Sequence, residues 1–262
     1  YPNLQTLVVD NGSTDDSVAR IRAACPDAHL LAHPENSGFA RGTNLGIARA
    51  LELGAAYVFI LNNDTLLAPD LLAQLLAQPT PDAGPLAPII YYAAAPHTVW
   101  SLGAEFNPWL LETRADVRGQ EDHGQWPAVL PRDFVPACGL LAHRDLFTRI
   151  GMFDARFFMY YEDLDFCLRV RQAGLPLRVV TTAKMWHKVS LSSGGSDSPN
   201  ERYWMARSSV LYFRKHARPW QWPLVIFWRS GSALRTSWRL LRARRPAALR
   251  AYWRGLWHGL RE

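Results

Sequence analysis

The segment from Tyr57 to Asp64 constrains the fold of this chain more than any other. It reads YVFILNND, a run of apolar residues that turns polar abruptly and ends on a carboxylate. Such a run predicts a buried strand whose last residues reach the edge of a sheet. The segment LQTLVVD, residues 4–10, shows the same pattern and is followed by the turn residues Asn11 and Gly12.

Helical patterns separate the predicted strands. They cover about residues 15–24, 40–53 and 69–78, with a further strand at about 29–32. Strands that alternate with such helices predict a layered α/β domain around a mostly parallel sheet. Ligands of these sheets bind beyond the carboxyl ends of the strands. Asp10 and Asp64 both occupy that kind of position.

The second half of the chain is less regular. Residues 93–131 are rich in Pro, Gly and Trp and are expected to form irregular strands and loops over the site. After them, the sequence predicts a strand over 134–142, a short helix over 144–150, a helix ending near Gly174 and a strand over 175–182. Residues 184–196 predict a mobile Ser/Gly-rich loop, and from Asn200 onward apolar and basic residues recur at helical spacing.

Composition limits the class of protein. The chain has 262 residues, 48% of them hydrophobic, which suffices for one α/β domain with a helical appendage. The three cysteines match neither a disulfide framework nor a zinc site, so a cytoplasmic location is expected. No stretch of eighteen apolar residues and no signal peptide is recognisable, so neither a membrane span nor export is predicted.

Charge divides the chain into residues 1–200, the predicted catalytic domain, and residues 201–262. From Arg202 onward there are 14 Lys/Arg and one acid, whereas the preceding residues hold 15 basic and 22 acidic side chains. The basic part also contains seven of the eleven tryptophans, a combination typical of nucleic-acid or membrane-surface binding. We expect Arg202–His216 to pack on the domain and residues 219–261 to lie on an anionic membrane. Packing of these helices on the domain or on another subunit is the alternative, and no known motif supports nucleic-acid binding.

Two segments have the composition of a nucleotide site. Asp10 followed by Asn11-Gly12 suits a base or ribose, although a plain turn with a helix cap explains it as well. In NSGFARGTN, small residues at Gly38 and Gly42 would allow close backbone approach to a ligand, and Arg41 could face a phosphate. Ordinary packing glycines are the alternative there.

Three further segments offer carboxylates or an imidazole. Asp64 in LNNDT suits Mg²⁺ or Mn²⁺, or else caps the next segment. In YYEDLDF, three acids open a helix, and the helix dipole alone would favour acids at that position. Their aromatic neighbours indicate partial burial, which raises the pKa of a carboxylate and suits a general base. Glu162 and Asp165 share a helix face, and Asp163 points about 100° away. His187 follows a strand end. A lone histidine is more often structural than a metal ligand.

Taken in order, these segments resemble the family 2 glycosyltransferases with the GT-A fold, particularly the rhamnosyltransferase-like branch. That branch carries Asp-Asn-Gly-Ser, Asn-x-Gly-Phe-Ala-x-Gly-x-Asn, Leu-Asn-x-Asp, Glu-Asp-x-Asp and Trp-His in this order, and all five occur between Leu4 and about Lys188. The resemblance implies a three-layer sandwich and an inverting, metal-dependent transfer of a sugar, with rhamnose as one option. It also implies that the chain begins at the family's second strand.

Roles for individual residues follow from the resemblance alone. Asp163 would be the catalytic base, and Asp64 and His187 would hold Mg²⁺ or Mn²⁺ on the donor diphosphate. The donor, a dTDP- or UDP-sugar, would contact Asp10, Asn11, Gly12, Asn36, Gly38, Arg41, Gly42, Asn44, Asn63 and Asp64. The acceptor side, for a saccharide or lipid-linked glycan, would hold Cys138, Gly139, Glu162, Asp165 and Trp186. A peripheral position on the inner face of the bacterial membrane is consistent with such an acceptor.

Two other functions remain open from the sequence. A nucleotidyltransferase that makes sugar nucleotides would normally need a glycine-rich basic loop near its N-terminus, and none is visible. A non-catalytic nucleotide-sugar- or carbohydrate-binding module could retain the fold, although the presence of Asp64, Asp163 and His187 argues against it. The sugar, the nucleotide, the acceptor, the linkage and the oligomeric state are not predicted.

Overall fold

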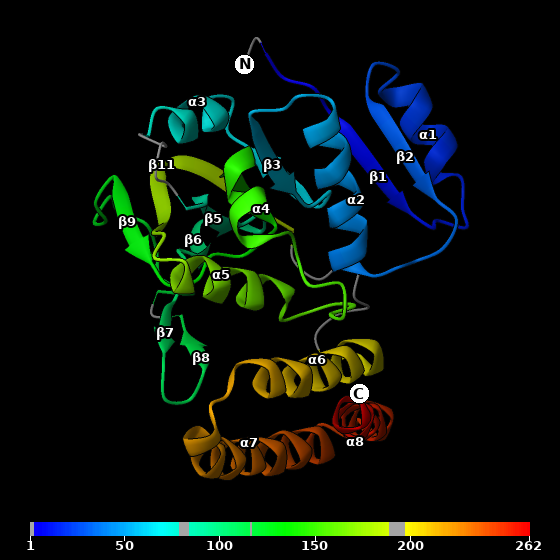
Figure 1. Cartoon of the computed structure of the whole chain (residues 1–262), viewed down its shortest axis with the longest axis vertical. Coiled ribbons are helices and arrows are strands. Elements are labelled where there is room, and N and C mark those ends of the chain that lie inside the picture. Colours follow the sequence, from blue (N-terminus) through cyan, green and yellow to red (C-terminus); the bar gives the residue numbers. More distant parts are fainter. Residues whose placement is uncertain (1–2, 79–83, 116, 189–196) are drawn as a thin grey trace.

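The computed structural model describes residues 3–78, 84–115, 117–188 and 197–262 (Figure 1). An α/β domain forms one end, and three C-terminal helices lie together at the other. The strands are β1 (Leu7–Asn11), β2 (His29–His33), β3 (Tyr57–Leu61), β4 (Thr65–Leu67), β5 (Leu86–Tyr92), β6 (Ala95–Ser101), β7 (Glu105–Asn107), β8 (Glu112–Arg114), β9 (Val129–Arg132), β10 (Gly139–His143) and β11 (Leu177–His187). The α-helices are α1 (Ser17–Ala24), α2 (Phe39–Glu52), α3 (Leu71–Leu76), α4 (Arg144–Ile150), α5 (Glu162–Gln172), α6 (Pro199–His216), α7 (Trp222–Arg242) and α8 (Pro246–Arg261).

The central sheet is mixed, whereas the sequence predicted a mostly parallel one. Its order is β3-β10-β5-β11-β4, with β6 paired to β5 and β9 paired to β11. β10 runs antiparallel to both of its neighbours, and only the β5–β11 pair is parallel. The hydrophobic pattern that predicts a buried strand carries no information on its direction, so this part of the prediction was wrong.

β1 and β2 form a separate parallel pair. Helix α2 packs against both β1 and β3 and so joins this pair to the central sheet. Its inner face is provided by small or apolar residues, with Ala40 and Ile47 fully buried. The spacing of these two residues places them on one side of the helix.

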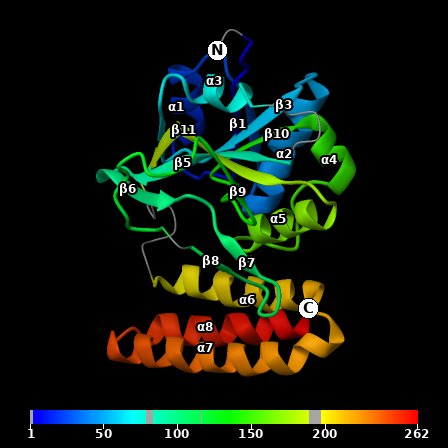
Figure 2. The same cartoon turned by 90° about the vertical axis from the view of Figure 1, so that its left-hand side faces the viewer.

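Helices cover the two faces of the central sheet, which gives the expected three layers (Figures 1 and 2). On one face, buried residues of α2, α4 and α5 share a core with residues such as Ile89, Leu140 and Val179. On the other face, Leu71 and Leu75 of α3 pack against the alternating strand residues. This alternation is the two-residue period of a strand buried on both sides.

Two irregular regions differ in detail from expectation. β11 continues to His187, although the sequence predicted a strand over 175–182 and a loop from 184. Its last residues pair with β4 and β5, which extends the strand. Most of the predicted mobile loop, residues 189–196, lies outside the described residues. Residues 93–131 do hold short strands, β6 to β9, connected by loops.

The C-terminal region is helical, as predicted. A short 3₁₀ turn, Pro219–Gln221, connects α6 to α7. α8 packs closely along α6, because Gly255 and Gly259 face backbone carbonyls of Tyr203 and Arg207. None of the helices in the described ranges is long and apolar enough to cross a bilayer.

Candidate functional site

Asp64 and His187 come together from two different strands. Asp64 lies in the turn between β3 and β4, and His187 ends β11 in register with Thr65. The distance from His187 Nε2 to Asp64 Oδ1 is 3.0 Å. Both side chains are largely buried, with 9% and 13% exposed. Strand pairing therefore joins the two residues that the sequence assigned to a metal.

This pair fits a divalent cation. Two ligands at about 2.1 Å from one octahedral cation lie about 3 Å apart, which is the spacing seen here. His187 Nδ1 is buried without a hydrogen-bond partner in the structure. No group of three or more His, Cys, Asp or Glu ligands occurs within the described ranges. A cation here would thus need substrate oxygens or water as its other ligands, which is typical of Mg²⁺.

The turn that carries Asp64 is held on both sides. The backbone N–H of Asn62 donates to the carbonyl of Cys138 on the neighbouring strand (3.1 Å), and that of Lys188 donates to the carbonyl of Asp64 (2.9 Å). Thr65 Oγ1 donates to the Asn62 carbonyl (2.7 Å). Asn63 is exposed at the tip. The carboxylate therefore sits on a fixed backbone.

Asp163 and Glu162 open helix α5. Burial raises the pKa of Asp163 to about 6, although backbone N–H groups of Leu164 and Ala137 favour its ionised form. Burial and the negative charge of Asp163 raise the pKa of Glu162 well above its ordinary value. Glu162 Oε2 is buried without a hydrogen-bond partner. The charge of Asp163 therefore favours the protonated form of Glu162.

Cys138 connects the two carboxylate sites. Burial raises the pKa of its thiol, and the negative charges of Asp163 and Asp64 raise it further. Both carboxylates thus lie within electrostatic range of one sulfur, at the same end of the sheet. The next residue, Gly139, leaves room for Met185, whose Cε would lie 2.7 Å from a Cβ at this position.

Asp165 does not face the same site, in contrast to the acceptor-side prediction. It is fully buried and bonded to cations from two helices. The distances are 2.9 Å to Arg169 Nε, 2.5 Å to Lys215 Nζ and 2.8 Å to His216 Nε2. These contacts tie α5 to α6. The one-turn spacing from Glu162 gave no sign of them, because the partners are distant in sequence.

The side-chain amide of Asn11 at the end of β1 is hydrogen-bonded to residues 36–39, which we call the NSGF loop. Asn11 Nδ2 donates to the Gly38 carbonyl (2.9 Å), and Asn11 Oδ1 accepts from the backbone N–H (3.1 Å) and hydroxyl (2.9 Å) of Ser37. Gly12 has φ +80°, and a Cβ there would lie 2.4 Å from Glu35 C. Asp10, buried at the end of β1, accepts from the backbone N–H of Ser13 (3.2 Å). Asn11 therefore holds the loop in place rather than facing a ligand.

The NSGF loop is in turn bound to the segment before α5. Asn36 Oδ1 accepts from the Gly38 N–H (3.0 Å), and the Phe39 N–H donates to the Phe158 carbonyl (2.6 Å). Gly38 has φ +86°, and a Cβ there would lie 2.4 Å from that same carbonyl oxygen. The glycine thus permits close approach to the protein's own backbone.

Gly42 and Asn44 also make internal contacts. A Cβ on Gly42 would lie 2.9 Å from Asn11 Nδ2. Asn44 donates to the Phe153 carbonyl (2.8 Å) and accepts from the Phe153 N–H (3.0 Å). The residues predicted to line the donor pocket therefore also connect α2 to the segment that carries Asp163.

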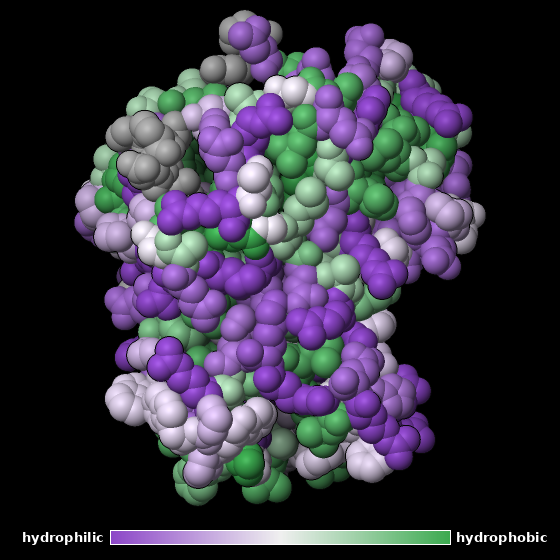
Figure 3. Space-filling model, in the orientation of Figure 1, coloured by the Kyte–Doolittle hydropathy of each residue, from purple (hydrophilic) through white to green (hydrophobic). Residues whose placement is uncertain are grey.

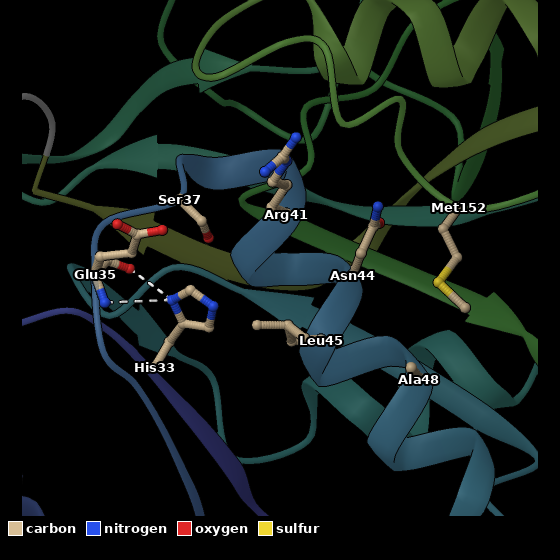
Figure 4. Close-up of a pocket in the computed structure, with 8 residues that line it drawn as sticks. All are labelled: His33, Glu35, Ser37, Arg41, Asn44, Leu45, Ala48 and Met152. Atoms are coloured by element: carbon tan, nitrogen blue, oxygen red, sulfur yellow. Dashed lines mark hydrogen bonds between the residues drawn. The ribbon is translucent and has the colours of Figure 1, made fainter.

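A cavity of about 410 Å³ opens beside this loop (Figure 4). Arg41, exposed on the first turn of α2, lines it together with Ser37 and Asn44. On the other side His33 Nδ1 lies 2.6 Å from the Glu35 carbonyl oxygen. Most of the cavity's lining is apolar, with Leu45, Ala48 and Met152 on its wall, and Arg41, Ser37 and Asn44 add polar groups at the end of β2.

Trp186 faces away from His187. Its indole stacks against Tyr91 with ring centroids 5.9 Å apart, and its Nε1 donates to the Pro96 carbonyl (3.0 Å). Consecutive strand residues point to opposite faces, so Trp186 and His187 cannot share one side of β11. The acceptor-side prediction for Trp186 is thus not supported by its position. Trp100 is the aromatic residue that contacts His187, at 4.6 Å between ring centroids.

Sequence reasoning missed the two tyrosines before α5. Tyr160 and Tyr161 have φ +67° and +69°, left-handed values that are costly for residues with bulky side chains. The Tyr161 side chain is partly buried against the cluster around Tyr212, within electrostatic range of Arg229 of α7. Arg229 also contacts Glu112 Oε1 (3.1 Å). Nothing in the local sequence indicated this strained approach to Glu162.

The chain is similar to known glycosyltransferases. Residues 1–120 match the model of the glycosyl transferase family 2. The chain is 27% identical to the N-acetylglucosaminyl-diphospho-decaprenol L-rhamnosyltransferase of Mycobacterium tuberculosis, over 89% of this chain and 82% of the relative. It is 25% identical to the dTDP-rhamnosyl transferase RfbF of Shigella flexneri, over 83% of this chain and 73% of the relative.

Solved structures show the same fold. The chain resembles GalNAc-T7, crystallised with UDP, GalNAc and Mn²⁺, with a TM-score of 0.58, 13% identity and 79% of this chain covered. It also resembles a mannosyltransferase from Pyrobaculum calidifontis in complex with GDP-Man and Mn²⁺, with a TM-score of 0.50, 18% identity and 95% covered. The chain spans 41% and 64% of those two chains, less than two thirds of either. The fold is that of the GT-A glycosyltransferases.

Proposed function

We propose a reaction for this chain from the premise that it is a family 2 glycosyltransferase of the rhamnosyltransferase-like kind. It would move a sugar from a nucleotide-diphosphate sugar onto an acceptor hydroxyl, with inversion at the anomeric carbon. The observation that carries the proposal is that residues 137 and 138 connect the two groups: the Ala137 N–H favours the ionised form of Asp163, and the Cys138 carbonyl accepts from Asn62 in the turn of the Asp64–His187 pair. The alternative of a non-catalytic binding module is not favoured by the family and its named relatives.

Asp64 and His187 are the residues that would hold Mg²⁺ or Mn²⁺. The Asp64 carboxylate suits either cation, and the burial of both side chains keeps the pair out of bulk water. When bound, the cation would stabilise the negative charge that develops on the leaving nucleoside diphosphate.

Asp163 is the proposed base. With a pKa of about 6, it is ionised at neutral pH and accepts a proton more readily than an ordinary carboxylate does. Burial and the charge of Asp163 raise the pKa of Glu162 and so disfavour a second charge beside the base. Asp163 would take the proton of the acceptor hydroxyl as the oxygen attacks the anomeric carbon and the nucleoside diphosphate leaves. One such displacement inverts the configuration without a covalent intermediate.

The donor would lie beyond β1, with its base near Asp10 and its phosphates near Arg41. The names of the relatives suggest the substrates: rhamnose from a dTDP-sugar, and an acceptor saccharide carried on a lipid diphosphate. UDP-sugars are the other option, since UDP is bound in a structure of similar fold. Polysaccharide or lipid-linked glycan synthesis is the corresponding process. The cytoplasmic location stays a prediction.

Titration of the chain with dTDP, UDP and GDP, with and without Mn²⁺, tests the donor site. We expect one nucleotide to bind in a metal-dependent way, and Asp64→Asn to remove the dependence on metal. Asp27→Asn, an exposed carboxyl in the loop between α1 and β2, serves as the matched control and should change nothing. Binding that is equal with and without metal would contradict the role of Asp64 and His187.

Turnover tests the base and the stereochemistry. Asp163→Asn should keep nucleotide binding and lower turnover by about 10²–10⁴-fold. The anomeric configuration of the product, followed by NMR before it equilibrates, should be opposite to that of the donor. Retention of configuration would refute the single displacement.

A further inference from the structure

The outer face of α7 carries large apolar side chains, although a helix face exposed to solvent is normally polar. The inner face of this helix is buried through Val225, Ala233 and Leu240. On the opposite side large apolar residues recur at spacings of seven, four and three, which places them on one stripe that points away from the protein. These residues, with the exposed fraction of each, are Phe227 (77%), Leu234 (68%), Trp238 (59%) and Leu241 (61%).

Helix α8 extends this stripe. Gly255 and Gly259 lie against α6, so the opposite side of α8 faces outward. Trp253 and Trp257 lie on that side, 49% and 52% exposed. Trp253 Nε1 donates to Ser237 Oγ of α7 (3.1 Å), next to Trp238. We refer to the exposed apolar residues of the two helices together as the Trp/Arg face: Phe227, Leu234, Trp238, Leu241, Trp253, Trp257 and Leu260, with the arginines that flank them.

The hairpin of β7 and β8 brings a further tryptophan to this end of the molecule (Figures 1 and 2). Trp109, at the hairpin tip, is 60% exposed and contacts the ring of Trp220 edge-on, with centroids 5.4 Å apart. Trp220 precedes α7 and is 55% exposed. In the space-filling view, hydrophobic and near-neutral residues gather along the lower edge, where α7 lies (Figure 3).

The charge of the region is one-sided. Residues 217–262 contain ten arginines and a single acid, Glu262. Arg235 and Arg242 are exposed beside the apolar stripe of α7. Arg242 lies over the ring of Trp238 (4.8 Å), and Arg261 lies over that of Trp257 (4.3 Å). Arginine forks bind phosphate oxygens well, and tryptophan favours the boundary between headgroups and acyl chains.

We propose that the Trp/Arg face binds the surface of an anionic phospholipid bilayer, with α7 lying in the plane of the interface. An outward apolar stripe flanked by arginines is the pattern of an interfacial helix, and α7 is about 31 Å long at 1.5 Å per residue. The positive charge is complementary to anionic headgroups, whereas an interface between two copies of this face would bring arginines against arginines. This proposal goes beyond the reaction and does not depend on it.

Such binding would place the site at a fixed height above the lipid. Arg229 on the inner side of α7 contacts both Glu112 of the hairpin and Tyr161, the residue just before Glu162. The helix that touches lipid is therefore one side chain away from the start of α5.

Flotation of the whole chain with lipid vesicles tests the proposal. We expect binding to vesicles that contain phosphatidylglycerol, weaker binding at high salt, and little binding to phosphatidylcholine alone. Replacing Arg235 and Arg242 by Ala should lower the partition coefficient about 25-fold, at about fivefold for each basic residue near the surface. Phe227→Ser with Trp238→Ser should weaken binding as well, with less dependence on salt.

The matched control is Arg20→Ala with Arg22→Ala, two exposed arginines of α1 at the other end of the molecule. This variant should bind as the parent does. Equal loss in the control, or no binding of the parent to anionic vesicles at low salt, would overturn the proposal. Sedimentation tests the alternative that a second copy of the chain covers this face. If the parent self-associates, the α7 variants are monomeric, and neither the parent nor the variants bind vesicles, the face is an interface between copies and the proposal is wrong.

Discussion

Replacing Asp163 by Asn should lower activity and raise stability at the same time. Burial raises the pKa of this carboxyl from 3.8 to about 6 in the fold. An acid whose pKa is raised on folding favours its protonated form, so its contribution to stability is lost as the pH rises from about 4 to above 6. At neutral pH the folded protein therefore holds an unfavourable charge at Asp163. Asparagine has nearly the same shape and removes that charge.

The size of the effect follows from the two pKa values. At pH 7.5 the difference between 3.8 and about 6 corresponds to about 3 kcal/mol of unfolding free energy. At pH 4.5, where most of the folded carboxyl is protonated, the same calculation gives about 1 kcal/mol. Asp163→Asn should thus gain more stability at pH 7.5 than at pH 4.5. The loss of the base should meanwhile lower kcat/KM by about 10²–10⁴-fold, or roughly 3–5 kcal/mol of transition-state stabilisation.

Urea unfolding at both pH values, followed by circular dichroism, measures the first effect, and initial rates measure the second. Asp27→Asn, at an exposed position, is the control and should shift neither. An equal gain at pH 7.5 and pH 4.5 would show that the change in stability is unrelated to titration of Asp163. A variant that keeps more than about a tenth of the turnover would refute the role of Asp163 as base.

The remaining predictions concern neighbouring positions. Glu162→Gln should keep most of the activity, because burial and the charge of Asp163 already favour the neutral form of Glu162; initial rates as low as those of Asp163→Asn would assign the base to Glu162 instead. Gly38→Ala should destabilise the fold, by about 1–3 kcal/mol in chemical denaturation, and weaken nucleotide binding. Gly54→Ala is the control: Gly54 has φ +85° and nothing within 4 Å of a Cβ, so this variant measures the cost of the backbone angle alone. Equal losses of stability in the two variants would show that the contact of a Gly38 Cβ with the Phe158 carbonyl costs nothing. Asp165→Asn should lower the free energy of unfolding by about 3–5 kcal/mol, because it leaves the largely buried Arg169, Lys215 and His216 without their carboxylate; thermal melts within a degree of the parent would contradict this.

Local pattern was sufficient to predict most helices and strands. The helices over 15–24, 40–53 and 144–150 match α1, α2 and α4 to within two residues, because an apolar stripe and a glycine or proline at the ends define each. The direction of β10 and the length of β11 were not predictable in this way. Both depend on which strands become neighbours, and Trp186 and His187 read as a loop until β4 and β5 pair with them.

In the candidate site, too, the features that depend on which elements become neighbours were not predictable from local sequence. The approach of His187 to Asp64 was expected from the family resemblance alone, because the local pattern places His187 in a loop beyond the strand. The ion cluster around Asp165 could not be predicted, because Lys215 and His216 are fifty and fifty-one residues away on another helix. Burial of an acid beside distant cations leaves no local signal, since three acids at a helix start are also what the dipole favours.

The polar residues of the donor segments show why a motif does not by itself assign ligand contacts. Asn11 and Asn44 satisfy backbone groups of Gly38 and Phe153 that would otherwise be partly buried without partners, and each such loss costs about 1–3 kcal/mol. Phe153 begins the segment that leads into α5, so these amides set the position of Asp163 relative to the donor loop. A site that aligns an acceptor with a leaving group needs this fixed separation as much as it needs contacts to substrate, because small displacements of the reacting groups are costly. The motif residues therefore act on the reaction partly through the backbone they hold, and Asp10 and Arg41 are the members left to meet the nucleotide.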